Sequence, residues 1–390
     1  MTSLIGRTAW IAILALAAIV AVGVEMDREG RRNFAVAQLV ARFVPASLQS
    51  SSLESLAHEA YDSGDAARGV ALSQAFVRRR PVPSEGLALL AYGQLQKGEQ
   101  DAALRSVVLA GDRGWRDRFT QETLVMLALQ AEEWSIAAQR TVALWRIGLN
   151  DDRLKEMTAD LLSRPQGVDA FAAQVGQEKY WANAFLPWAG TAIRPEALKT
   201  VASTMARKGA RVDCAALSPR TLMLVRSGRA EAASILWQNL CANGHFTRAA
   251  DFAFREDLGD GAPIGPFDWQ YPEESGLDRS FTGSKAGTVL HYRNREPLRS
   301  VIAKRNALLA PGNYRARMDG AAHAEAGFRP IVLQIVCYAE DGTARRLGDA
   351  EMTSGSTDFF IPDTFCASQE LVILSGRGEG EIGRLEIDPA

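Results

Sequence analysis

The sequence lacks the short motifs that mark most enzymes. It contains four histidines, and none stands at a metal-ligand spacing from another histidine or a cysteine. No GxSxG, HExxH, Walker or Rossmann pattern occurs. The formal net charge is -2, and the compact basic run at residues 78–80 is interpreted as the cationic end of a helix. These absences argue against a nucleic-acid partner, which requires a basic face, and we expect no enzyme activity, cofactor or metal site.

Cysteine is also scarce, and its four copies show no CxxC spacing that would indicate zinc. They stand in two pairs along the chain, which is typical of an oxidising compartment. We predict the disulfides Cys214–Cys241 and Cys337–Cys366. Each would close a loop of roughly 30 residues and stabilise the fold by about 3–4 kcal/mol in the loop-entropy description. Four buried free thiols are the alternative.

Charge is absent from residues 9–24, and this apolar run reaches most of the way across a ~30 Å hydrocarbon layer at about 1.5 Å per residue. Arg7 precedes the run and Arg28, Arg31 and Arg32 follow it, so the cations alone leave the orientation open. No small-x-small cleavage site directly follows the run. We predict an uncleaved anchor over residues 1–30, with a cleaved signal peptide or a buried first helix as alternatives. The anchor and the cysteines together predict a single-pass protein of the bacterial inner membrane whose body faces the periplasm.

Residues 50–151 contain one helical-hairpin pattern three times. Leu56, Leu90 and Leu124 stand 34 residues apart. The turn position in the same register holds Gly64, Gly98 and Glu132, each followed by an acidic residue, and a small residue recurs at positions 69, 103 and 137. These residues resemble tetratricopeptide repeats, which are stacked two-helix units of this period. A helical bundle with coincidental spacing is the alternative.

This resemblance implies a binding surface on the first helix of each unit. The implied partner-binding residues are Glu54, His58, Tyr61, Glu85, Tyr92, Gln96, Glu122, Met126 and Gln130. Aromatic, methionine and amide side chains among acids suit an extended peptide or a helix of a protein partner. The alternative is that these residues are ordinary solvent-facing side chains.

The remaining pattern predicts a multidomain chain, helical first and then β. Residues 31–49 read as a juxtamembrane helix and linker, and residues 50–258 as the tetratricopeptide-like repeat domain, closed by a helix at 249–256. Residues 259–266 form a Gly- and Pro-containing linker. Residues 267–390 show about eight short segments of period-two alternation, which predict an antiparallel β-sandwich. Residues 308–314 resemble a hairpin of jelly-roll, carbohydrate-binding-like domains.

Aromatic residues of the β region suggest a second binding surface. Trp269, Tyr271 and Tyr292 can stack on the sugar rings of a glycan, and filling of the sandwich core is the alternative for these side chains. Carboxylates also flank Trp269 and Tyr271, as a glycosidase would require, although acidic residues in such a loop are usually only solvated. These carboxylates are Asp268, Glu273, Glu274 and Asp278.

Three hypotheses follow from these features. The first is a non-catalytic, membrane-anchored scaffold of the cell envelope that binds a protein partner through its helical repeats. The second is a glycan-binding protein of envelope polysaccharide synthesis or export that acts through the β-sandwich. The third is a carbohydrate-active enzyme, which needs a facing pair of carboxylates in a cleft of the β region.

Overall fold

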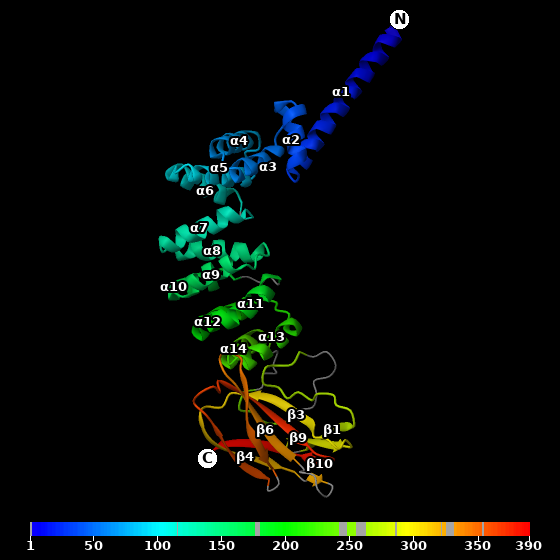
Figure 1. Cartoon of the computed structure of the whole chain (residues 1–390), viewed down its shortest axis with the longest axis vertical. Helices are drawn as coiled ribbons and strands as arrows, with labels where there is room; N and C mark the ends of the chain where they lie inside the picture. Colours follow the sequence, from blue (N-terminus) through cyan, green and yellow to red (C-terminus); the bar gives the residue numbers. More distant parts are fainter. Residues whose placement is uncertain are drawn as a thin grey trace. The chain divides into compact units, whose positions relative to one another are not determined.

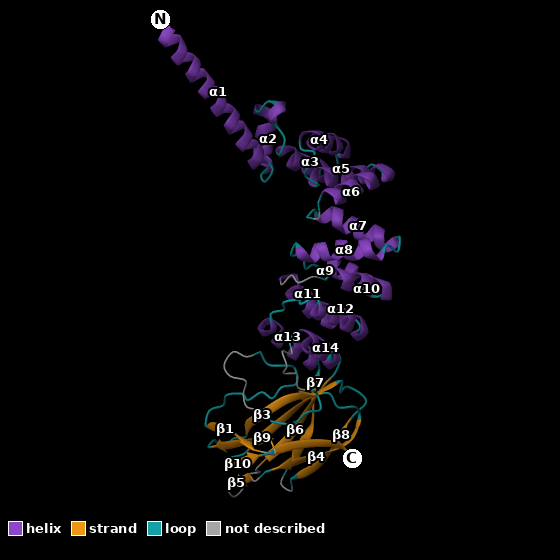
Figure 2. Cartoon of the chain, turned by 180° about the vertical axis from the view of Figure 1, so that it is seen from behind, coloured by secondary structure: helices purple, strands orange, loops and turns teal. Residues whose placement is uncertain are grey.

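The computed structural model describes residues 2–114, 116–175, 180–241, 248–254, 263–284, 287–320, 322–324, 331–352 and 355–390. Within these ranges the chain forms fourteen α-helices followed by eleven strands, all paired antiparallel (Figures 1 and 2). The predicted fold class, an apolar N-terminal helix, then helices, then antiparallel sheets, is confirmed. The chain divides into two compact units, Met1–Leu161 and Leu162–Ala390.

The first unit begins with the long helix α1 (Thr2–Gly30), which projects away from the other helices of this unit in both views (Figures 1 and 2). Its segment Ala9–Gly30 is, within the part of the chain that the structure describes, the one helix long and apolar enough to cross a membrane, and none of that segment's most apolar window is buried. Helix α2 (Phe34–Phe43) and a short 3-10 helix (Ala46–Leu48) follow it. The length and hydropathy of α1 therefore fit either a membrane span or a signal sequence.

The repeat region consists of three successive helical hairpins. They are α3 (Ser52–Asp62) with α4 (Ala66–Arg79), α5 (Glu85–Gln96) with α6 (Gln100–Arg113), and α7 (Arg118–Gln130) with α8 (Trp134–Arg146); α9 (Asp152–Leu162) comes next. The two helices of each hairpin pack on each other, and α4 and α6 contact the first helix of the following hairpin. The small residues at positions 69, 103 and 137 are buried in this packing, as the pattern indicates.

The three hairpins share one turn geometry. Gly64, Gly98 and Glu132 all adopt left-handed backbone conformations, with φ of 80°, 77° and 57°. The N–H of each donates to a carbonyl three residues earlier, and the next N–H donates to a carbonyl five residues earlier. This pair of backbone hydrogen bonds closes the C-terminus of a helix and satisfies two carbonyls that would otherwise lack a donor. Glu132 therefore occupies a position that favours glycine.

The second unit combines five helices with the strands. The helices are α10 (Pro165–Gln174), α11 (Tyr180–Ala192), α12 (Pro195–Arg207), α13 (Cys214–Arg226) and α14 (Ala230–Leu240). The strands are β1 (Leu277–Ser284), β2 (Gly287–Asn294), β3 (Ser300–Ala307), β4 (Gly312–Asp319), β5 (Ala322–Ala324), β6 (Ile331–Tyr338), β7 (Ala344–Glu351), β8 (Ser356–Ile361), β9 (Ser368–Ser375), β10 (Gly378–Ile382) and β11 (Arg384–Pro389). They form sheets of order β1-β2-β10-β5, β11-β4-β8 and β3-β9-β6-β7.

The strands enclose one hydrophobic core. Leu290, Met318, Ile335 and Leu385, which come from all three sheets, belong to the same cluster of buried side chains. Helix α13 packs against β9, where Arg226 pairs with Glu370 at 3.0 Å and the Ser368 hydroxyl donates to the Val225 carbonyl. The last helices and the sheets therefore belong to the same compact unit.

Both predicted disulfides are present. Cys214 pairs with Cys241 and Cys337 pairs with Cys366, with Cα–Cα separations of 5.5 and 4.8 Å. The first bond ties the start of α13 to the residue after α14, and the second ties β6 to the segment before β9. All four cysteines are thereby paired, which indicates an oxidising compartment for the second unit.

The closing helix expected at residues 249–256 is wrong where the structure describes that segment. Residues 251–254 belong to no helix or strand, and Phe252 and Phe254 join the core of the β region. The buried guanidinium of Arg305 donates to the carbonyls of Arg248, Ala249 and Asp251. Contacts with the β core and with Arg305 therefore fix the position of this segment, and it does not pack as a helix on the repeats. The predicted linker at 259–266 falls partly outside the described residues, and the domain boundaries around it stay a prediction.

Candidate functional site

A pocket of about 280 Å³ opens on the first helices of the three hairpins. Its lining comes from α3, α5 and the start of α7: Glu54, His58, Tyr61, Asp62, Glu85, Ala88, Leu89, Tyr92, Asp117 and Phe119. Five of the nine predicted partner-binding residues are therefore brought together, namely Glu54, His58, Tyr61, Glu85 and Tyr92. We call this site the acidic pocket.

Aromatic rings in mutual contact form one part of the acidic pocket. Tyr61 and Tyr92 meet edge to face at 5.3 Å between ring centroids, and Tyr92 and Phe119 do so at 5.7 Å. Tyr61 is almost fully buried, whereas Tyr92 is 39% exposed. Burial raises the pKa of Tyr61, so its phenol remains neutral at physiological pH. Tyr92 is therefore the ring most available to a ligand.

Tyr61 fits because two glycines leave space for it. A Cβ atom at Gly69 of α4 or at Gly93 of α5 would overlap the Tyr61 ring. The Tyr61 hydroxyl makes a hydrogen bond of 2.9 Å with the Ser73 hydroxyl, which satisfies the buried phenol. Gly69, the small residue early in α4, therefore leaves the space that the Tyr61 ring needs to line the pocket.

Four carboxylates give the pocket its charge, and they come from Glu54, Asp62, Glu85 and Asp117. Arg31, in the turn after α1, approaches Glu54 at 2.5 Å and Glu85 at 3.3 Å, so it offsets part of this charge on one side. Asp117 caps α7 by accepting the Thr120 N–H at 2.7 Å. Carboxylates outnumber cations here, and aromatic rings lie among them. Such a site favours a positively charged group, through charge-assisted hydrogen bonds and cation–π contact.

The other four predicted residues lie outside the acidic pocket. Gln96 and Gln130 are exposed at the ends of α5 and α7. Glu122 is buried and pairs with Arg118 at 2.5 Å and Arg153 at 3.0 Å, so its charge is already matched within the fold. The sulfur of Met126 lies 3.7 Å from the same arginine, Arg153. A 34-residue period therefore places side chains on a common surface without making them one site.

Sequence reasoning missed Arg31, Asp62, Asp117 and Phe119. Asp62 follows His58 by four residues and so lies on the same helix face, which is a usable signal. Asp117 directly precedes a predicted helix, where a capping side chain is expected. Arg31 has no local signal, because it reaches α3 and α5 from the turn after α1, 23 and 54 residues away in the sequence from Glu54 and Glu85.

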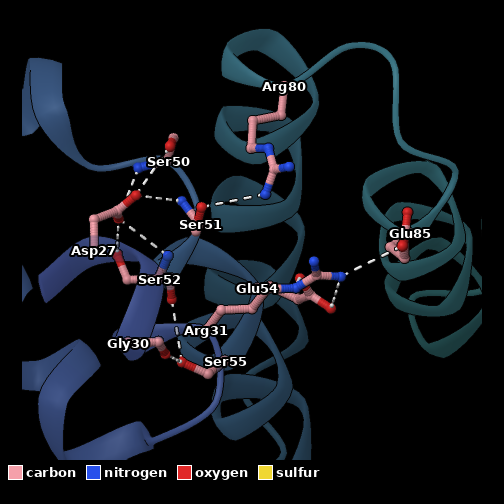
Figure 3. Close-up of polar contacts among 10 residues, drawn as sticks. All are labelled: Asp27, Gly30, Arg31, Ser50, Ser51, Ser52, Glu54, Ser55, Arg80 and Glu85. Atoms are coloured by element: carbon pink, nitrogen blue, oxygen red, sulfur yellow. Dashed lines mark hydrogen bonds and ion pairs between the residues drawn. The ribbon is translucent and has the colours of Figure 1, made fainter. Parts of the chain in front are cut away.

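The end of α1 is joined to the start of α3 by a buried carboxylate (Figure 3). Asp27 is only 2% exposed and accepts the N–H groups of Ser50, Ser51 and Ser52 at 2.9, 2.7 and 3.1 Å. It also accepts the hydroxyls of Ser50 and Ser52 at 2.9 and 2.7 Å. The Ser51 and Ser52 N–H groups are free donors at the N-terminus of α3, where a negative charge is favoured. The serine run therefore folds around a residue of the first helix, and we call this contact the Asp27 joint.

The predicted glycan-binding aromatics are placed mainly in the core of the β region. Trp269 and Tyr292 are buried, and Trp269 stacks on Phe254 at 4.7 Å between ring centroids. Burial raises the pKa of Tyr292 to about 12. Tyr271 is partly buried and packs edge to face on Phe281 at 4.9 Å. The alternative interpretation, that these rings fill the core, describes their positions, because flat apolar rings are best buried between sheets.

The nearby carboxylates have structural partners. Asp268 accepts the Gly265 N–H at 2.7 Å, and Glu274 accepts the Val301 N–H at 3.0 Å. Asp278 pairs with Arg295. Two of these carboxylates thus bind backbone groups of their own region and a third is matched by a cation. In the described residues no group of three or more His, Cys, Asp or Glu side chains is placed to hold a metal ion.

Comparison with known proteins finds no matching family model and no matching curated protein. Three solved structures show low similarity. Accessory secretory protein 1, 2 and 3 of Streptococcus pneumoniae matches at 11% identity over 37% of this chain and 99% of that chain, with a TM-score of 0.27. The glycosylation-associated protein complex Gap123 of Streptococcus agalactiae matches at 11% identity over 35% of this chain and 44% of that chain, with a TM-score of 0.27. The xylan-binding domain CBM22-1 of Paenibacillus barcinonensis Xyn10C matches at 10% identity over 37% and 99%, with a TM-score of 0.24. Similarities at this level carry no conclusion about this chain.

Proposed function

We propose that this protein is a non-catalytic, membrane-anchored scaffold of the cell envelope that binds a protein partner through its helical hairpins, which we take to be tetratricopeptide-like. The acidic pocket is the observation that carries this proposal, because it combines a half-exposed ring, Tyr92, with four carboxylates on the first helices of three hairpins. A lysine or arginine side chain of the partner is the ligand that this chemistry favours.

We further propose that α1 anchors the chain in the bacterial inner membrane and that the body lies in the periplasm. The apolar segment of α1 and the two disulfides support this location. The Asp27 joint supports an uncleaved anchor, since removal of α1 would leave the N-terminal N–H groups of α3 without their acceptor.

Co-purification from native membranes tests the proposed partner site. The full chain is compared with the variant Asp62→Lys/Tyr92→Ala, which reverses an exposed pocket charge and removes the exposed ring. Asp101→Lys, an exposed residue of α6, makes the same charge change away from the pocket and serves as the matched control. We expect the pocket variant to lose a protein that the original chain and the control both retain. Equal recovery of the same proteins with all three chains would refute the proposal.

The alternative, a glycan-binding protein that acts through the β region, takes second place. Among the three predicted sugar-stacking residues, Trp269 and Tyr292 are buried. A glycan array probed with the full chain tests this alternative. Binding to a polysaccharide that Tyr271→Ala abolishes would move it to first place, and no binding would remove it.

A further inference from the structure

Helix α2 doubles back along the end of α1 (Figure 1). Ala37 and Val40 form its buried side and are fully covered. Near the turn, a Cβ atom at Gly30 would lie 3.1 Å from the Ala37 backbone, so the two helices are in close contact there. At the other end of α2, a Cβ at Gly23 would lie 3.7 Å from Val44 and 3.8 Å from Leu48. The C-terminal end of α2 therefore lies at the height of Gly23, where the apolar run of α1 ends.

A neighbouring side of α2 exposes large apolar side chains. Phe43 is 68% exposed and Leu39 is 48% exposed, and they stand four residues apart on one face. The guanidinium of Arg42 lies 5.3 Å from the centroid of the Phe43 ring. Leu39 and Val36 also line an apolar groove shared with Ala21, Val22 and Met26 of α1, together with Glu25 and Glu29. The exposed apolar surface of α2 is thus continuous with that of α1.

Hydrogen bonds cap both ends of α2, and they set the position of Phe43 along the axis of α1. Asn33 caps the first turn by accepting the Ala35 N–H at 3.0 Å. The side-chain amide of Gln49 donates to the carbonyls of Val40 and Val44 at 3.2 and 2.8 Å. Because α2 is capped at both ends and packs on α1 through Ala37 and Val40, Leu39 and Phe43 stay on the solvent side of the helix in this packing.

We propose that α2 is an interfacial membrane helix, with Phe43 and Leu39 inserted at the boundary between headgroups and acyl chains and Arg42 directed to lipid phosphates. This inference rests on the proposed anchor. Lipid is the occupant because the exposed face of α2 continues the surface of the candidate span and ends at the height where charges begin after Val24. Aromatic and basic residues at the end of a helix at that height suit the boundary between headgroups and acyl chains.

Two membrane contacts would give the acidic pocket a defined orientation relative to the bilayer. The bilayer would hold α1 and α2 together, the Asp27 joint connects them to α3, and Arg31 reaches the pocket residues Glu54 and Glu85. Tilt of a single membrane helix is set by its interfacial anchors and by packing against neighbours. Two membrane contacts therefore orient the pocket where one would leave it free to rotate.

Depth-dependent quenching of a fluorophore tests the inference. All four native cysteines are paired, so a cysteine introduced into the full chain supplies the one free thiol for an environment-sensitive label. Labels at Phe43→Cys, Leu16→Cys and Ala35→Cys are compared in vesicles of phosphatidylcholine and phosphatidylglycerol that contain lipids spin-labelled at shallow or deep positions. Ala35 is the matched control, because it is exposed on the same helix about 12 Å farther from the bilayer at ~1.5 Å per residue.

We expect shallow spin labels to quench the fluorophore at position 43, deep labels to quench it at position 16, and neither to quench it at position 35. Quenching at 16 without quenching at 43 would overturn the interfacial helix while leaving the anchor intact, and would assign the apolar face of α2 to a protein partner. No quenching at 16 would overturn the anchor and the inference together.

Discussion

At the scale of single residues, backbone conformation and the available space explain which residue types recur in the repeats. The turn position requires a left-handed backbone in all three hairpins, and the chain meets this requirement with two glycines and Glu132. The residue at position 69 must be small because Tyr61 occupies the space beside it. The local structure therefore explains the residue type at each of these positions, without reference to a binding partner.

The turn after α7 provides the first prediction. A non-glycine residue in the left-handed region costs roughly 1–2 kcal/mol, and glycine carries a smaller entropic cost, so Glu132→Gly should stabilise the first unit by about 1 kcal/mol. Hydrogen exchange of the α7 and α8 amides measures the change as slower exchange. Gly98→Ala, at the equivalent turn, should have the opposite effect. Faster exchange in Glu132→Gly would contradict the assignment of strain to this turn.

The Asp27 joint provides the second prediction. Replacing this buried carboxylate by alanine leaves the N–H groups at the start of α3 without an acceptor, which should cost about 2 kcal/mol. We expect faster hydrogen exchange at residues 51–54 in Asp27→Ala. Glu29→Ala removes an exposed carboxylate two residues away and should change little. Equal protection in the two variants would show that the joint does not stabilise α3.

At the scale of elements, what decides a prediction is whether its cause lies nearby in the sequence. The helical hairpins rest on turn residues and apolar periodicity, so their positions could be predicted. Cysteine spacing within each region likewise led to both disulfides. The Asp27 joint joins residues more than twenty positions apart through one carboxylate, and no periodic pattern marks such a contact.

The segment at residues 249–254 shows the same limit for the second unit. A closing helix is expected there to cover the last apolar face of the repeats, but Phe252 and Phe254 both enter the core of the β region. The guanidinium of Arg305 lies 4.7 Å from the centroid of the Phe252 ring and donates to the carbonyls of Arg248, Ala249 and Asp251. Its burial could not be recognised from its place in the sequence. For the same reason, exposed and buried aromatics such as Tyr92 and Trp269 could not be distinguished before their surroundings were known.

Arg305 provides the third prediction. Arg305→Leu leaves the partly buried carbonyls of Arg248, Ala249 and Asp251 without this donor, which should lower the free energy of unfolding of the second unit by on the order of 3 kcal/mol. Arg317→Leu is the control, because the ion pair of Arg317 with Asp388 is exposed and should contribute about 0–1 kcal/mol. Thermal unfolding of the full chain in detergent compares the two. A similar shift in both variants would mean that Arg305 is no more important than a surface arginine.

At the scale of the whole molecule, the apolar helix and the disulfides support one location. The two disulfides indicate an oxidising compartment for the second unit, and the apolar segment of α1 fits either a membrane span or a signal sequence. The cations on the two sides of the span do not decide the orientation, so the fourth prediction addresses it. Alkaline phosphatase fused after Ala390 should be active in cells, because that enzyme requires its own disulfides. An inactive fusion present at normal amounts would place the body in the cytoplasm.

The proposed function depends on the acidic pocket as a docking site for a cationic group of a protein partner. A photo-crosslinking amino acid at His58, within the pocket, tests this claim in intact cells, with the same amino acid at the exposed Leu104 of α6 as the control. The account predicts a discrete crosslinked protein from position 58 that is absent from position 104 and is lost when Asp62→Lys is added. The same crosslinks from both positions, unchanged by the charge reversal, would contradict it.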